Sequence, residues 1–144
     1  MPLIYLNTPE AIFTANARDA LAEELTMIAL ESEQLPTTPY VKSTTWIYVK
    51  EYAPTHVYHG GKSGGTGVIS LEVNAFEGGL DAQKKESLIT RFTAAIKKHA
   101  GIADGALVPV YIILRDVSTL NWGVFGDTIQ LDDLRNPPAD AEPV

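Results

Sequence analysis

The chain has 144 residues, of which 45% are hydrophobic, and its net charge is -7. This length and composition predict one soluble domain with an ordinary core. The acidic balance argues against a nucleic-acid surface, which needs Lys and Arg to neutralise phosphates. Neither a membrane-spanning run of about 20 apolar residues nor a signal-peptide pattern is present, so we expect a cytoplasmic protein without membrane contact. The absence of cysteine excludes disulfides and thiolate chemistry.

The first part of the chain predicts a β-α-β unit. Residues 3–7 form a short apolar strand, directly after Pro2, where a strand tolerates a missing N–H. From Thr14, a candidate N-cap, apolar residues recur every three or four positions as far as residue 35, which predicts an amphipathic helix. Pro36 and Pro39 are expected to end that helix. Residues 44–52 are aromatic and β-branched and predict the second strand.

The same order starts again after the glycine-rich run 60–67, which we interpret as a hairpin or a linker between units. Residues 68–74 predict a strand, Asp81 caps a second helix, and Gly101 suits the left-handed position that follows a helix. Residues 108–114 predict the fourth strand. The second helix is expected to bury a stripe of three apolar residues, Ile89, Phe92 and Ile96.

Two such units in tandem predict an α+β fold, with a four-stranded mixed sheet and both helices on one face. We expect a single domain over residues 1–131, with units at about 2–61 and 68–126. An acidic, proline-rich tail over 132–144 should be loosely ordered or lie over a neighbouring chain. The other face of the sheet would carry apolar residues without a cover, which predicts that copies of the chain associate through it.

Pro2 is the leading candidate for chemistry. If Met1 is removed, Pro2 begins the chain with a free secondary amine. In a desolvated pocket or near a cation the charged form is disfavoured, so the amine pKa falls toward neutrality and the group becomes a competent general base. If Met1 is retained, the same nitrogen is an amide and has no such basicity. Most Met-Pro starts have no catalytic role, so the dipeptide alone is weak evidence.

The tandem units, the opening Met-Pro-Leu-Ile and the segment Asn-Trp-Gly-Val-Phe-Gly at 121–126 together resemble the tautomerase superfamily. The two-unit length is similar to that of the cis-3-chloroacrylic acid dehalogenase family and of fused 4-oxalocrotonate tautomerase-like proteins. This resemblance implies a homotrimer, no cofactor and no metal. It also implies an amino-terminal proline at the base of a pocket that a neighbouring chain helps to line, and a small-molecule substrate that is a carboxylate.

The resemblance assigns roles to only some residues of this chain. Pro2 matches the catalytic proline. Trp122 falls where the small tautomerases have an apolar aromatic wall, and Tyr58 is expected to be its counterpart in the first unit. The water-activating glutamate of the dehalogenases aligns with Asn121, and their tyrosine matches Tyr111 if a gap of one residue is allowed.

The arginines that hold the substrate carboxylate in the family have no match at the corresponding positions, which are near Ile12, Trp46, Gly79 and Pro109. Arg115, at the end of the fourth strand, is the remaining candidate for gripping an anion through a bidentate pair. An ion pair with Asp116 or with a neighbouring chain is an equally plausible use of this guanidinium.

These residues predict an isomerase, a keto-enol tautomerase acting on an enol or a 2-oxo acid. Pro2 would be the catalytic base, and the substrate-binding residues would be Arg115, Trp122, Tyr58, Asn121 and Tyr111. One alternative is a hydratase or dehalogenase of unsaturated acids, for which the groups that activate water are missing. The other alternative is an oligomeric binding protein that kept the scaffold without its chemistry.

Overall fold

The computed structural model describes residues 2–64 and 67–144. Met1, whose removal the Pro2 hypothesis requires, and residues 65–66 of the glycine-rich run lie outside the described residues. The main sheet has four strands, β1 (Leu3–Pro9), β2 (Trp46–Tyr52), β5 (Ile69–Phe76) and β6 (Val110–Val117), in the order β2-β1-β5-β6. Pairing is parallel within each unit and antiparallel between β1 and β5. The predicted mixed sheet is therefore confirmed.

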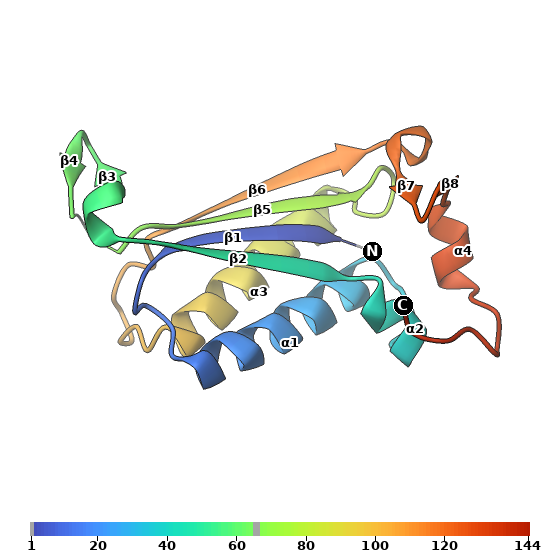
Figure 1. Ribbon diagram of the computed structural model, residues 1–144, viewed down its shortest axis with the longest axis horizontal. Helices are drawn as coiled ribbons and strands as arrows, with labels where there is room; N and C mark the ends of the chain where they lie inside the picture. The colour runs from blue at the N-terminus through green and yellow to red at the C-terminus, as the bar shows by residue number, and fades with distance from the viewer. Residues whose placement is uncertain (1, 65–66) are drawn as a thin grey trace.

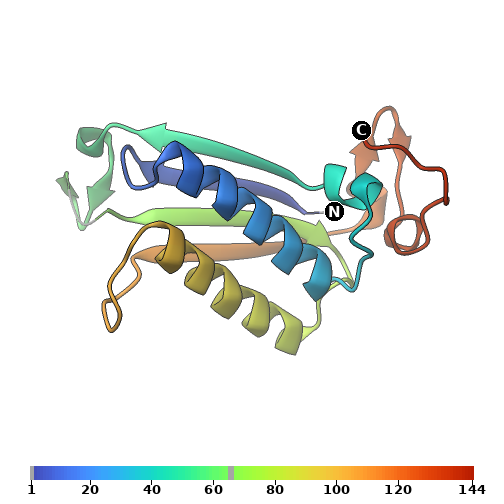
Figure 2. The same cartoon turned by 90° about the horizontal axis from the view of Figure 1, so that it is seen from below.

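Two long helices, α1 (Ala15–Ser32) and α3 (Ala82–His99), lie side by side on one face of this sheet (Figures 1 and 2). Both predicted caps are present, because the side chains of Thr14 and Asp81 accept hydrogen bonds from backbone N–H groups in the first turns of α1 and α3. Gly101 has a φ of 65°, as the left-handed position after a helix requires.

The predicted buried stripe of α3 is wrong at one residue. Phe92 and Ile96 are fully buried, but Ile89 is 39% exposed. Leu88, four residues before Phe92, takes the inward position, since side chains four apart lie on one face of a helix. The main core fills the space between the helices and the sheet and includes Ile4, Leu6, Leu25, Leu71, Val73, Leu88 and Phe92.

Each unit closes with a short 3-10 helix and a small hairpin. In the first unit these are η1 (Pro54–His56) and the strands β3 (Tyr58–His59) and β4 (Lys62–Ser63). In the second they are η2 (Thr119–Asn121), β7 (Gly123–Val124) and β8 (Asp127–Thr128). This repeat corrects one sequence assignment. Trp122 follows η2 as Val57 follows η1, so Val57, rather than Tyr58, is the counterpart of Trp122.

Two short helices were not predicted. Pro39, expected only to stop a helix, begins α2 (Pro39–Ser43), because proline is well tolerated in a first turn. The other helix, α4 (Leu131–Arg135), starts at the boundary assigned to the tail. Its apolar residues join a second core at one end of the sheet, which contains Leu30, Leu35, Val41, Phe76, Trp122, Leu131 and Leu134.

The tail also differs from the expectation of a loosely ordered segment. Leu134 is fully buried, and the chain then returns toward α2, where the Val144 N–H donates to Ser43 Oγ at 3.0 Å. The N- and C-terminal ends of the described chain therefore lie near each other at the same end of the sheet (Figure 1).

The sheet face opposite the helices carries large side chains that this chain leaves exposed. They are Tyr5, Trp46, Tyr48, Tyr111 and Ile113, with exposed fractions between 40% and 81%. The rings of Tyr5 and Tyr48 stack at a centroid separation of 5.6 Å. Within residues 2–64 and 67–144, no helix combines the length and the apolar character needed to cross a bilayer.

Candidate active site

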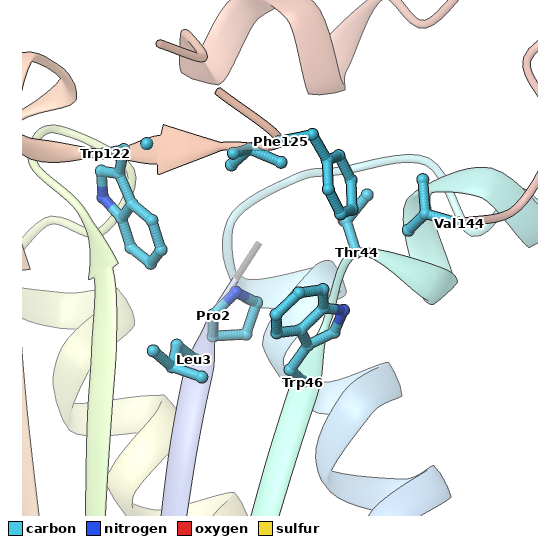
Figure 3. A pocket seen from close by; sticks show the side chains of 9 residues that line it. Pro2, Leu3, Thr44, Trp46, Trp122, Phe125 and Val144 are labelled. Carbon is cyan, nitrogen blue, oxygen red and sulfur yellow. The ribbon is translucent and has the colours of Figure 1, made fainter. Parts of the chain in front are cut away.

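A pocket of about 160 Å³ opens beside Pro2 at the start of β1. Pro2 itself is buried, and Figure 3 shows its nitrogen directed into the space between Trp122 on one side and Trp46 and Phe125 on the other. The pocket is lined by residues from the beginnings of β1 and β2, from the β7–β8 hairpin and from the end of the tail: Pro2, Leu3, Thr44, Trp46, Trp122, Gly123, Val124, Phe125 and Val144.

Trp46 and Phe125 form one wall. Their ring centroids are 6.3 Å apart with an interplanar angle of 58°. The Trp46 ring is held in place by its Nε1–H, which donates to the Ser43 carbonyl at 3.1 Å. Phe125 sits in the tight β7–β8 turn with a φ of 53°, a conformation that non-glycine residues seldom adopt. The turn thereby directs the Phe125 ring toward Trp46, on the same side of the pocket (Figure 3).

Trp122 forms the opposite wall. Its ring lies 4.9 Å from that of Phe76, and only 9% of the residue is exposed, so its orientation is fixed by packing in the second core. The indole nitrogens of both Trp46 and Trp122 lie on the sides of the rings away from Pro2, and the rings therefore present carbon to the pocket (Figure 3). Trp122 Nε1 is buried and has no hydrogen-bond partner among the described residues.

The lining contains little polarity. Thr44 supplies its one side-chain hydroxyl, and that group donates to the Val41 carbonyl at 2.7 Å. None of the described lining residues has a charged side chain. In the described part of the chain, no three histidine or carboxylate side chains gather as a metal site would require. The arrangement can thus enclose an apolar group next to the Pro2 nitrogen.

Arg115, the sequence candidate for binding a carboxylate, does not line this pocket. Its position on β6 pairs with Asn74, which pairs in turn with Leu3, so two strand spacings, about 10 Å, separate the backbone of Arg115 from β1. The guanidinium makes an ion pair with Glu72 on the neighbouring strand, and not with Asp116. Asp116 pairs instead with Lys85.

The remaining sequence candidates lie at different distances from the pocket. Asn121 ends η2 immediately before Trp122, at the pocket edge, and is exposed. Tyr111 is 81% exposed near the start of β6, in register with Ser70 and Asn7, roughly 17 Å along the sheet from Pro2. Tyr58 belongs to the β3–β4 hairpin at the far end of the sheet (Figure 1). Within one chain, only Trp122 of the proposed binding residues meets Pro2.

The sequence patterns do not mark Trp46, Phe125 or Val144 as pocket residues. Trp46 carried a usable signal, because the register of a parallel pair sets residue 46 beside residue 3 and hence next to Pro2. Phe125 and Val144 reach the pocket through a turn and a returning tail, for which the sequence offered no comparable signal.

Comparison with solved structures supports the fold over most of the chain. A fused 4-OT, described as a wild-type symmetric trimer, superposes with a TM-score of 0.73 at 22% identity over 88% of this chain and 94% of that one. A member of the cis-3-chloroacrylic acid dehalogenase family gives 0.73 at 13% identity, covering 89% of this chain and 83% of that one. Macrophage migration inhibitory factor of Toxoplasma gondii gives 0.69 at 16% identity, covering 88% and 99%.

No curated protein sequence matches the chain significantly. Residues 70–131, which include most of the second unit and Trp122, match the family model described as tautomerase enzyme. The second unit is therefore similar to the tautomerase family, and the whole chain shares the fold of two β-α-β units with the fused 4-OT and cis-3-chloroacrylic acid dehalogenase family structures.

Proposed function

We propose that the protein is a cofactor-independent keto-enol tautomerase in which the amine of Pro2, freed by removal of Met1, transfers the proton. The observation that carries this proposal is the burial of Pro2 with its nitrogen directed into an apolar pocket. Burial among apolar groups disfavours the ammonium form, so we expect the pKa of this amine to be lower than that of an ordinary chain terminus.

The proton transfer requires no other reagent. The neutral Pro2 nitrogen takes the proton of the enol hydroxyl and leaves an enolate. An electron pair of the enolate oxygen then forms the carbonyl double bond as the C=C electrons take the proton from the Pro2 ammonium at the carbon next to the carbonyl, which regenerates the amine. A general base positioned in this way contributes on the order of 10² to 10⁴ in rate.

The composition of the pocket favours this reaction over hydration or dehalogenation. Adding water across a double bond needs groups that orient and deprotonate the water, and the polar side-chain group that faces this pocket is the Thr44 hydroxyl, already donated to Val41. The 2-oxo acids, which the family resemblance implies as substrates, remain the first compounds to assay.

We also propose that the protein acts as a homotrimer. The uncovered apolar face of the sheet supports association, and several similar structures are described as trimers of fused 4-OT. Tyr58, Asn121, Tyr111 and Arg115 are distant from, or at the margin of, the pocket of their own chain. If they contact substrate, Tyr58, Tyr111 and Arg115 do so in a neighbouring copy.

The test compares wild-type protein with Pro2→Ala in the conversion of phenylenolpyruvate to its keto form. We expect kcat/KM to fall by at least about 10²-fold, because the base is removed while the pocket walls remain. Pro54→Ala is the matched control, since Pro54 is exposed in η1 beside the far hairpin. Its kcat/KM should equal that of the wild type.

Mass spectrometry of the purified protein must show that Met1 is absent from the active fraction. Equal activity of Pro2→Ala and wild type, or full activity in protein that retains Met1, would contradict the proposed mechanism. No activity in a processed wild-type protein that still binds ring compounds would favour the non-catalytic binding protein.

A further inference from the structure

The pocket beside Pro2 has the size and the lining to hold one aromatic ring. Its volume of about 160 Å³ is close to that of cavities that accommodate one benzene-sized group. Trp46 and Phe125 face it from one side and Trp122 from the other, and each tryptophan turns its nitrogen away from the space (Figure 3). Leu3 and Val144 add aliphatic surface. The surfaces nearest Pro2 are therefore carbon almost throughout.

No cationic side chain of residues 2–64 and 67–144 lines this space. All four arginines make ion pairs elsewhere: Arg18 with Glu51, Arg91 with Glu31, Arg115 with Glu72 and Arg135 with Asp132. Lys42 in α2 is two residues before the lining residue Thr44, but it does not line the pocket.

A carboxylate in these surroundings would lose its hydration without gaining a charged side chain as a partner, and Pro2 is neutral when it acts as the base. The effective penalty for removing an ion from water inside a protein is several kcal/mol unless it is paired and hydrogen-bonded. An uncharged carbonyl avoids this penalty, and its ring gains contacts with the three aromatic side chains.

We propose that this site prefers an uncharged, ring-bearing enol or ketone, such as the ester of a 2-oxo acid, to the free acid. This inference rests on the proposed function of Pro2 and names its substrate class. The ring occupies the space between Trp46, Phe125 and Trp122, and the enolisable carbon lies beside the Pro2 nitrogen.

Binding can be measured without turnover. The chain has two tryptophans, and both line the pocket, so intrinsic fluorescence reports directly on its occupancy. The probes are 3-phenylpropanoate and its methyl ester, which share a ring and a carbon skeleton, differ in charge, and do not undergo the reaction. We expect the full-length protein to bind the ester at least about tenfold more tightly than the acid.

Two variants and one control separate the contribution of the ring contact to binding from that of the charge. Trp46→Ala should weaken ester binding by about tenfold, with Trp122 remaining as the reporter. Leu107→Ala, an 88% exposed residue at the other end of the sheet, should leave ester binding unchanged. Lys42→Gln should not alter binding of the acid.

Tighter binding of the acid than of the ester would overturn the inference, and so would selective loss of acid binding in Lys42→Gln. The proposed function fails separately. If the ester binds preferentially but processed wild-type protein converts neither phenylenolpyruvate nor its methyl ester, the preference of the pocket for uncharged ligands is supported and the proposed catalysis is wrong. If Pro2-dependent turnover occurs but the acid binds more tightly, the catalytic role of Pro2 is supported and the proposed preference for an uncharged substrate is wrong.

Discussion

Pro2 owes its surroundings to the alternation of side chains along β1. Ile4 and Leu6 are buried toward the helices, Tyr5 is exposed on the opposite face, and Pro2 continues the buried series by the period of two residues that strands follow. The same alternation along β2 and β6 places Glu51 and Asp116 within reach of the helices. Arg18 pairs with Glu51 in the first unit, and Lys85 pairs with Asp116 in the second.

The contacts of Glu24 between the two long helices make the free energy of unfolding depend on pH. The carboxylate of Glu24 on α1 accepts hydrogen bonds from Lys98 and His99 of α3, at 2.8 and 2.7 Å. These hydrogen bonds lower the pKa of Glu24 below its ordinary value of 4.5, against a smaller opposing effect of burial. A lowered pKa in the folded state means that the stabilisation is complete above the unfolded-state pKa and is lost as pH falls through the folded-state pKa.

We therefore predict that Glu24→Gln lowers the free energy of unfolding at pH 7 by less than about 1 kcal/mol, since the pair is partly exposed. The difference from wild type should shrink as the pH falls below 4.5 and through the lowered pKa of Glu24, because the wild-type carboxylate then becomes protonated as well. Urea unfolding at several pH values measures both. Glu86→Gln, an exposed position on α3, is the control, and a Glu24→Gln difference independent of pH would contradict the prediction.

At the scale of elements, the loop between β5 and α3 fits closely against the end of α1. Glu33, the C-cap of α1, is fully buried, and a methyl group built at Gly79 would approach its Oε1 and the Phe76 carbonyl to 3.1 Å each. Gly79 does not have a positive φ, so what requires glycine there is space rather than backbone conformation. The close packing at Gly79 therefore lies between the end of α1, at Glu33, and Phe76 of the second core, which also contains Trp122.

We predict that Gly79→Ala lowers the free energy of unfolding by about 1 kcal/mol or more, because a tightly packed site must expand to admit the methyl group. Gly123→Ala is the matched control, since a Cβ there meets nothing within 4 Å and the φ is also not positive. It should be neutral or slightly stabilising, through a smaller entropy of the unfolded chain. Chemical denaturation of both variants is the measurement, and equal effects would refute the packing argument.

The whole molecule has one covered and one uncovered sheet face. The helices bury one side of the four strands, and the other exposes Tyr48 on β2 and Ile113 on β6, at 54% and 47%. A contiguous apolar face of this kind typically marks an interaction surface. Association through it would bring open-face residues such as Arg115 and Tyr111 close to another copy of the chain.

We predict that the wild-type protein is a trimer and that the double variant Tyr48→Glu/Ile113→Glu is a monomer at micromolar concentration, because carboxylates would have to be desolvated in the interface. Light scattering coupled to size-exclusion chromatography gives the mass, and circular dichroism checks the fold. Ile89→Glu, on the helical layer, should leave the mass unchanged. A monomeric wild type, or a trimeric double variant, would rule out this surface as the interface.

The sequence by itself determined the two units, the caps at Thr14 and Asp81 and the identity of the four main strands, because periodicity and capping are local properties. It also singled out Pro2 and Trp122, which the fold brings together. The tertiary structure alone decided which other groups meet Pro2. Trp46 arrives through strand register, Phe125 through a tight turn and Val144 through a tail that returns to α2, and contacts between such distant parts of a chain leave no periodic trace in the sequence.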